Sequence, residues 1–190
     1  MKQKIIRIIK SRTFVFAIAL VLIAVGFSFK FGFFDRNKSN GATMPSNSAQ
    51  SSEFSLSIPS LNVEAPILQD VDPTNADIYN KALQGGVAHM TGTALPGDDK
   101  GNIFIYGHSS ASAASKYDKV FAGLNDLNNS DSINVLYKGK SFIYLVTDKK
   151  IVEKTDMTVL DQTLSEQLTL MTCWPIGTDE QRLVVIAKKQ

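Results

Sequence analysis

The 190-residue sequence predicts a mostly β domain with six to eight strands, one to three short helices and a preceding membrane-spanning helix. From residue 54 onward, short runs rich in β-branched and aromatic residues recur between turn-forming segments, which is typical of a largely antiparallel, closed or semi-closed sheet. Two segments in this region have the apolar spacing of helices, and a separate apolar run lies near the N-terminus.

The N-terminal apolar run covers residues 13–34, where Lys30 is the one charged residue. It is long enough to cross a bilayer, which takes about 20 apolar residues in a helix. Residues 1–12 are basic and contain no acid, so the positive-inside bias predicts a cytoplasmic N-terminus and an extracellular remainder. No Ala-x-Ala-like cleavage site follows closely, which favours an uncleaved transmembrane anchor over a signal peptide.

Charge is unevenly divided along the chain. Residues 1–34 hold six of the 20 Lys and Arg residues, so the remainder carries 14 basic against 18 acidic residues. This mildly acidic part has no clustered basic face for phosphates, which argues against nucleic-acid binding. Residues 35–53 are rich in Ser, Asn and Gly and predict a flexible linker, leaving residues 54–190 as one globular domain.

The first half of this domain predicts three strands and a helix. Residues 54–68 alternate apolar and polar side chains on either side of Pro59, which indicates two short strands joined by a turn. Residues 75–83 begin with an Asn cap and are followed by two glycines, as a short helix would be. Residues 101–108, "GNIFIYGH", predict a buried strand that ends at Gly107–His108.

The second half predicts a helix over residues 116–127, which carry Val120, Leu124 and Leu127 on one stripe. Residues 133–153 indicate a hairpin with a long second arm. The last two strands, "QLTLMTC" and "RLVVIAK", flank the loop "WPIGTDEQ".

The chain has a single cysteine, Cys173, at the exit of the first of these two strands. It cannot form an internal disulfide, so in an exported domain the thiol is expected either to be buried or to take part in the protein's chemistry. A nucleophilic thiolate is stabilised by a nearby imidazolium. His108, at the end of a predicted strand, is a better partner than His89, which falls in a predicted loop. Arg182 lies at the entry of the last strand. The loop between it and Cys173 contains Pro175 and Gly177 and could fold back, which would bring the guanidinium beside the thiol to hold a developing oxyanion.

These residues resemble the sortase family of membrane-anchored cysteine transpeptidases. "TLMTC", followed by "RLVVIAK" and preceded by "GNIFIYGHSS", is similar to three motifs that the family shows in the same order, and the resemblance covers about residues 54–189. It implies an eight-stranded β-barrel. It also implies cleavage of a Leu-Pro-x-Thr-Gly-like signal, between Thr and Gly, at the C-terminal end of secreted proteins.

The resemblance also implies a role for each site residue. Cys173 would form a thioacyl-enzyme that an amine resolves, and the amine would come from a peptidoglycan precursor or a pilin lysine. His108 would act as acid and then base, and Arg182 would orient the signal and stabilise the oxyanion. Thr172 and Trp174 would lie at the substrate. No metal or other cofactor is required by this chemistry.

Within the family, the segment from Cys173 to Arg182 contains a Pro and a Gly. In this it resembles the corresponding segment of the pilin-polymerising and the class D and E sortases more than that of class A or B. Pilin-polymerising members carry an Asp-Pro-aromatic lid ahead of the barrel, and residues 35–53 contain none. The "VDPTN" segment at 71–75 has Asp-Pro without the aromatic residue. A class D-like or E-like role is therefore favoured, with a pilin-polymerising sortase as the alternative.

Other functions are less consistent with the sequence. Ser109 and Ser110 lack the Gly-x-Ser-x-Gly elbow of a serine hydrolase, and the two histidines lack a third metal ligand at a recognisable spacing. Water could replace the amine and make the protein a thiol hydrolase, or the domain could be a non-enzymatic adhesin or assembly factor with a buried cysteine. Calcium binding stays open through scattered acids, namely Asp70, Asp72, Asp98, Asp99 and Glu153.

Overall fold

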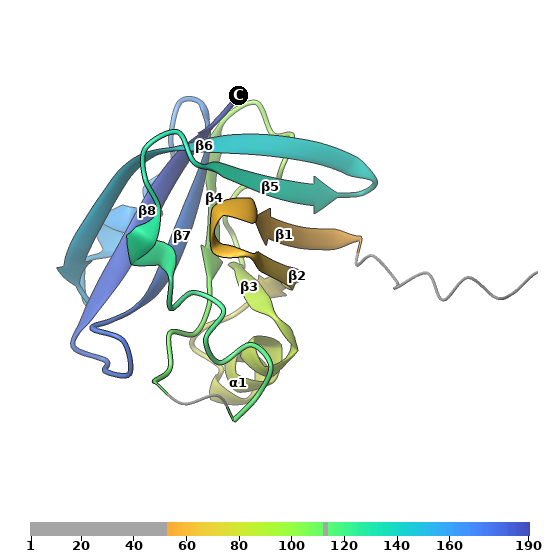
Figure 1. Ribbon diagram of the computed structural model, residues 1–190. Helices are drawn as coiled ribbons and strands as arrows, with labels where there is room; N and C mark the ends of the chain where they lie inside the picture. The colour runs from red at the N-terminus through yellow and green to blue at the C-terminus, as the bar shows by residue number, and fades with distance from the viewer. Residues whose placement is uncertain (1–52, 112–113) are drawn as a thin grey trace, which may run out of the picture. The chain divides into compact units, whose positions relative to one another are not determined.

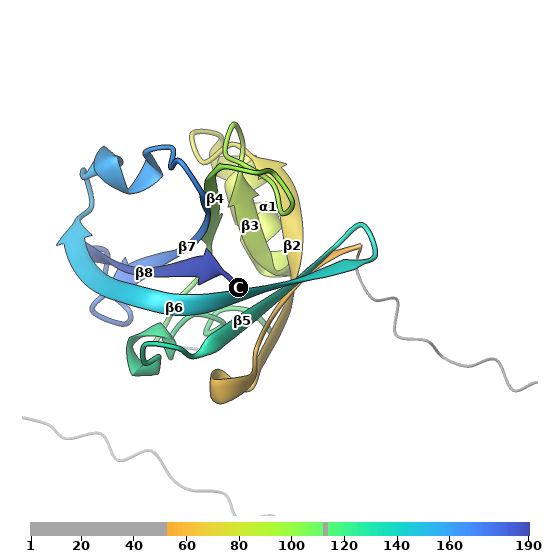
Figure 2. The ribbon, with the colours of Figure 1, turned by 90° about the horizontal axis from the view of Figure 1, so that it is seen from above.

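The computed structural model describes residues 53–111 and 114–190, and these form a closed eight-stranded β-barrel (Figures 1 and 2). The predictions for residues 1–12, for the anchor at 13–34 and for nearly all of the linker lie outside the described residues. In the part that is described, no helix has the length and apolarity needed to span a membrane. The strands are β1 (Phe54–Ile58), β2 (Val63–Val71), β3 (Val87–Met90), β4 (Gly101–Tyr106), β5 (Ser132–Tyr137), β6 (Lys140–Glu153), β7 (Glu166–Trp174) and β8 (Gln181–Lys189).

One α-helix and three short 3-10 helices complete the described fold. They are α1 (Ala76–Gly85), η1 (Pro59–Leu61), η2 (Leu124–Asp126) and η3 (Met157–Leu160). The side chain of Asn75 accepts a hydrogen bond from the backbone N–H of Ile78 and caps α1, so the predicted cap is confirmed.

The order of strands around the barrel is β1-β2-β3-β4-β7-β8-β6-β5, with β5 closing on β1. The pairs β2–β3 and β4–β7 are parallel and the other pairs are antiparallel, so the largely antiparallel prediction holds. The β4–β7 pair is parallel and joins strands that are far apart in the sequence. It sets Tyr106 opposite Met171, so the C-terminal ends of both strands lie at the same end of the barrel.

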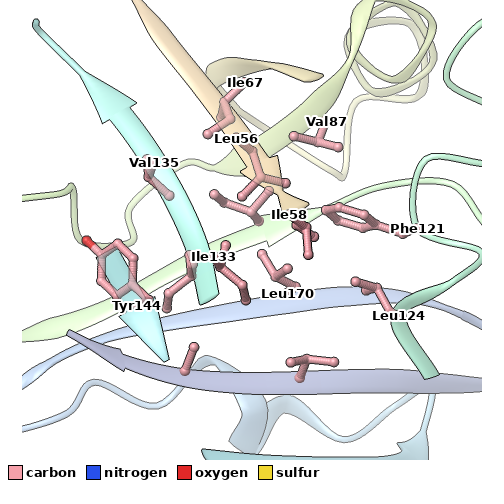
Figure 3. Close-up of a cluster of buried hydrophobic side chains, with 14 of the residues drawn as sticks. Leu56, Ile58, Ile67, Val87, Phe121, Leu124, Ile133, Val135, Tyr144 and Leu170 are labelled. Atoms are coloured by element: carbon pink, nitrogen blue, oxygen red, sulfur yellow. The ribbon is translucent and has the colours of Figure 1, made fainter. Parts of the chain in front are cut away.

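The barrel interior is filled by alternate side chains of nearly every strand (Figure 3). The close-up shows Leu56 and Ile58 of β1, Ile133 and Val135 of β5 and Leu170 of β7 gathered in one cluster. Because successive strand residues point to opposite faces, the odd-numbered residues of β7 and the even-numbered residues of β4 and β8 point outward.

A second apolar layer covers this outer face. Phe104, Tyr106 and Val184 pack there with Leu83 of α1 and Val159 of η3. Strand β4 is therefore buried on both faces, which explains why its residues 103–106 are a continuous apolar run rather than an alternating one.

The predicted helix over residues 116–127 is wrong. The segment instead forms consecutive turns that end in η2. Backbone N–H groups bond three residues back, as from Val120 to Tyr117 and from Leu124 to Phe121. Phe121 and Leu124 are completely buried in the interior cluster (Figure 3), and Gly123 lowers the helix propensity between them. Tertiary packing therefore overrides the helical spacing.

The prediction that His89 lies in a loop is also wrong, because His89 belongs to β3 and its side chain is completely buried. Its Nδ1 atom lies 3.4 Å from the backbone N–H of Asp70, which donates to it. Its Nε2 atom lies 3.0 Å from the carbonyl oxygen of Ala94, to which it can donate. Both ring nitrogens are thus satisfied by a neutral imidazole.

Burial lowers the pKa of His89 below its ordinary value of 6.5. The unfolded chain therefore binds a proton at a higher pH than the folded chain, so the free energy of unfolding should fall as the pH drops through about 6.5. Urea unfolding at pH 7.5 and 5.5 measures this loss. Carboxylates whose pKa the fold lowers, such as Asp156, add losses only at more acidic pH. The His89→Gln variant should show a smaller loss between these two pH values, and an equal loss would contradict the prediction.

Candidate active site

Cys173 and Arg182 are direct neighbours across the β7–β8 hairpin. The antiparallel register sets their Cα atoms opposite one another, so the loop between them does fold back. Cys173 shares the outward face of β7 with Met171, and Arg182 shares the outward face of β8 with Val184. The thiol and the guanidinium therefore start from facing positions on the same side of the sheet.

His108 follows β4 by two residues, and its neighbours on both sides are tied to the end of β7. The backbone N–H of Gly107 donates to the carbonyl of Met171 at 3.2 Å, and the Thr172 hydroxyl donates to the carbonyl of Gly107 at 2.8 Å. The hydroxyl of Ser109 donates to the carbonyl of Cys173 at 2.6 Å. These bonds extend the β4–β7 ladder and place the His108 backbone beside that of Cys173.

The half-buried His108 side chain interacts electrostatically with the Asp118 carboxylate, and it is not among the residues that line the cavity beside Cys173. Phe104 and Tyr106 point to the outer layer, but β4 ends at Tyr106, so the strand alternation does not set the direction of His108. Its carbonyl accepts a hydrogen bond from the Phe121 backbone at 2.9 Å, which anchors the segment from the other side. The structure thus brings Cys173 and Arg182 to one end and one face of the β7–β8 hairpin, with the His108 backbone beside that of Cys173.

Two glycines permit this close assembly. A Cβ atom at Gly107 would lie 2.8 Å from the Phe121 ring and 3.0 Å from the Val87 side chain. Gly177, in the β7–β8 loop, has φ +80°, and a Cβ there would lie 2.8 Å from the Cβ of Ala111. The loop after His108 and the loop after Cys173 therefore contact one another, joined by a hydrogen bond from the Gly177 N–H to the Ser109 carbonyl.

A cavity of about 370 Å³ opens on this face. One group of lining side chains is apolar or aromatic and includes Tyr79, Met90, Phe104, Tyr106 and Met171. The other group is polar or charged and consists of Lys154, Asp156, Thr172, Cys173, Asp179 and Arg182. The cavity thus offers an apolar wall beside a charged end that holds the thiol.

One wall of the cavity is formed by η3, which is fastened to the barrel by a buried amide. The side chain of Asn102 donates to the carbonyl of Val159 at 2.9 Å and accepts from the hydroxyl of Thr169 at 2.7 Å. Asn102 is 1% exposed, so this link is shielded from water. The segment between β6 and β7 is therefore held at the cavity by a buried side chain of β4.

Asp179 is one of two residues of the site that the sequence pattern did not single out. Its Oδ1 atom lies 2.8 Å from Nη1 of Arg182, and the same oxygen accepts a hydrogen bond from Sγ of Cys173 at 3.7 Å. The loop sequence gave one usable signal, since an acid three residues before an arginine can pair with it.

The thiol in this arrangement is a weak acid. Burial raises the pKa of Cys173 above its ordinary value, and the carboxylate of Asp179 raises it further, while Arg182 opposes both effects. The guanidinium of Arg182 in turn lowers the pKa of Asp179. At neutral pH the resting state is therefore a protonated thiol beside an ionised carboxylate.

Tyr79 of α1 was not singled out from the sequence either. Its ring stacks on that of Tyr106 with centroids 5.6 Å apart, and it lines the cavity near the thiol. Burial raises the pKa of Tyr79, and the charge of a Cys173 thiolate adds to that rise.

The two predicted substrate-binding residues differ in their surroundings. Thr172 lines the cavity, and its hydroxyl is engaged by the Gly107 carbonyl. Trp174 packs against the interior apolar cluster and is not among the residues that line the cavity. Its role at the substrate stays a prediction.

Metal ligands are not gathered in the described part of the chain. No group of three or more His, Cys, Asp or Glu side chains in residues 53–111 and 114–190 is arranged to hold an ion. Asp72, one of the acids considered for calcium, instead accepts hydrogen bonds from the N–H and hydroxyl of Thr74. The next residue, Pro73, lines the cavity.

Comparison with known proteins places these features in a family. The sortase domain family matches residues 56–190. The chain is 30% identical over 138 residues to Sortase D of Bacillus subtilis (strain 168), covering 70% of this chain and 62% of that protein. It is 27% identical over 130 residues to Sortase A of Bacillus anthracis, covering 68% of this chain and 56% of that protein. The chain thus spans about three fifths of the length of these curated relatives.

Solved structures agree with these matches. Sortase C-1 from Actinomyces oris superposes with a TM-score of 0.63 at 29% identity, covering 72% of each chain. Sortase A from Corynebacterium diphtheriae superposes with a TM-score of 0.60 at 30% identity, covering 72% of this chain and 60% of that one. The eight-stranded barrel expected from the sequence is therefore the fold of these relatives, and the match to Sortase D agrees with the class D-like interpretation. Because the family match covers most of the chain, the protein belongs to the sortase family.

Proposed function

We propose that this protein is a cysteine transpeptidase that cleaves a C-terminal sorting signal and transfers the acyl part to an amine. The observation that carries the proposal is the placement of Cys173 opposite Arg182 across the β7–β8 hairpin, with the His108 backbone beside that of Cys173. Membership of the sortase family supports this activity.

In the first half-reaction, the sulfur of Cys173 attacks the carbonyl carbon of the scissile peptide bond while the thiol proton passes to His108. Arg182 stabilises the negative charge on the carbonyl oxygen. The C–N bond then breaks, His108 returns the proton to the leaving amine, and a thioester remains on Cys173.

In the second half-reaction, an amine attacks the thioester carbon and His108 accepts its proton. The C–S bond breaks and the sulfur regains a proton, so the enzyme is restored and a new amide is formed. Neither half-reaction needs a cofactor.

The cavity suits a peptide in an extended conformation. Its aromatic and Met side chains favour an apolar residue upstream of the cleaved bond, while its charged end accepts the polar backbone at the thiol. These properties are consistent with a Leu-Pro-x-Thr-Gly-like signal cleaved between Thr and Gly.

The proposed partners and location follow from the family and the N-terminal sequence. Substrates would be secreted proteins with a sorting signal, and acceptors would be a peptidoglycan precursor or a lysine of another protein. Residues 13–34 would anchor the enzyme in the cell membrane, with a cytoplasmic N-terminus and the catalytic domain outside.

The test uses full-length protein with Leu-Pro-x-Thr-Gly peptides that vary at each position, in the presence and absence of an amine such as triglycine. Mass spectrometry should show a peptide–amine product and, at short times, a thioacyl adduct on Cys173. Free acid as the sole product at saturating amine would establish a hydrolase instead. Absence of both adduct and cleavage across the library would overturn the proposal.

A further inference from the structure

We propose that Asp179 is an internal ligand of the active site, which occupies Arg182 and the Cys173 thiol until a substrate displaces it. The proposal goes beyond the transpeptidase function, on which it rests for the role of Cys173 as nucleophile.

The contacts of the Asp179 carboxylate are those expected of a bound ligand. Oδ1 bridges the two site residues, at 2.8 Å from Arg182 and 3.7 Å from the sulfur. Oδ2 lies 3.7 Å from Nζ of Lys154, which also lines the cavity. One carboxylate therefore contacts a thiol and two cations at the charged end of the cavity.

This position conflicts with catalysis. Arg182 has to pair with the oxygen of the substrate carbonyl as negative charge develops on it, and a guanidinium held by a carboxylate is less available for that pairing. The Asp179 oxygen also lies beside the sulfur that must become negative, where a like charge opposes ionisation. Productive binding therefore requires the carboxylate to leave.

Displacement is feasible because the rest of the loop is held by other contacts. Gly177 is bonded to the Ser109 carbonyl, and both the backbone and the hydroxyl of Thr178 are bonded to the Pro175 carbonyl. The side chain of Asp179 is 68% exposed, against 20% for Arg182. Rotation of one side chain toward solvent would release Arg182 without unfolding the loop.

Other ionisable groups around the thiol are the same with and without Asp179, so one substitution isolates its effect. They are Tyr79 of α1, Tyr106 of β4, Lys154 and Asp156 of the segment that follows β6, and Arg182 of β8. The backbone of His108, in the segment that follows β4, lies beside that of Cys173.

The experiment measures alkylation of Cys173 by iodoacetamide between pH 5.5 and 10 in the full-length protein. Only the thiolate reacts, forming a C–S bond and releasing iodide. In Asp179→Asn and Asp179→Ala, the midpoint of the rate profile should move to lower pH. The rate at pH 7 should rise about threefold, because a larger thiolate fraction is partly offset by lower nucleophilicity.

Glu180→Gln is the matched control. Glu180 is exposed and neighbours Asp179, so this variant makes the same change in net charge without altering the contacts of Asp179 with Arg182, Cys173 and Lys154. Its profile should coincide with that of the unmodified protein. The proposal would be overturned if the Asp179→Asn profile coincided with those of the unmodified protein and of Glu180→Gln.

The alkylation test does not depend on transpeptidation. A protein without peptide-cleaving activity would refute the proposed function and still report whether Asp179 controls the thiol. Where cleavage is present, Asp179→Asn should lower KM about threefold with little change in kcat, as expected when a competing internal ligand is removed. An unchanged or higher KM would count against the proposal.

Discussion

Replacing Cys173 with alanine is expected to lower the rate of the proposed acyl transfer by at least about a thousandfold, because the chain has no other cysteine to form the thioester. Folding should be nearly unaffected. Cys173 is partly exposed at the end of β7, so the free energy of unfolding should change by less than about 1 kcal/mol. Steady-state transfer of a peptide to triglycine and urea unfolding measure the two quantities.

Cys173→Ser is the companion variant, since it keeps the size and hydrogen-bonding capacity of the side chain but makes a poorer nucleophile. It should fold equally well and be almost as inactive as the alanine variant. Transfer activity that survives in Cys173→Ala would exclude a thioacyl mechanism. A large loss of stability in both variants would instead indicate that the thiol serves packing.

Replacing Arg182 with alanine is expected to lower kcat/KM of the proposed transfer about a hundredfold, which is the usual cost of removing one donor to an oxyanion and follows from the role proposed for Arg182. Arg182→Lys should recover part of this loss, since an ammonium keeps the charge but not the planar fork. Because Arg182 opposes the effects that raise the pKa of Cys173, both variants should also be tested by iodoacetamide. In Arg182→Ala, the midpoint of alkylation should move to higher pH.

The matched control is Lys188→Ala, which removes a positive charge from the exposed end of the same strand. Its kcat/KM and its alkylation profile should be unchanged. An equal loss of activity in Lys188→Ala and Arg182→Ala would mean that net charge, rather than the position opposite Cys173, determines the effect.

Much of the barrel is predictable because its elements have strong local patterns. The two-sided apolar run of β4, the β5–β6 hairpin and the capped helix α1 each agree with their own sequence. The errors fall where local pattern and tertiary packing disagree. Residues 116–127 have helical spacing but are drawn into turns by burial of Phe121 and Leu124, and the four residues of β3 are too few to show a period.

The site was predictable in part for the same reason. Strand ends are visible in a sequence, so the positions of His108, Cys173 and Arg182 at such ends could be inferred. The β4–β7 pairing joins segments far apart in the sequence, and no local signal indicates that it is parallel. Asp179 could not be distinguished from other loop acids, because its contacts depend on the path of the loop.

The parallel pairing of β4 with β7 has a consequence for how reactivity arises during folding. The β7–β8 hairpin can form from neighbouring residues, but His108, the proposed acid and base, belongs to a segment more than sixty residues earlier. That long loop therefore has to close before the proposed chemistry can occur. A chain whose barrel has not closed can therefore hold Cys173 opposite Arg182 without the His108 segment beside them, so all three residues come together only in the finished barrel.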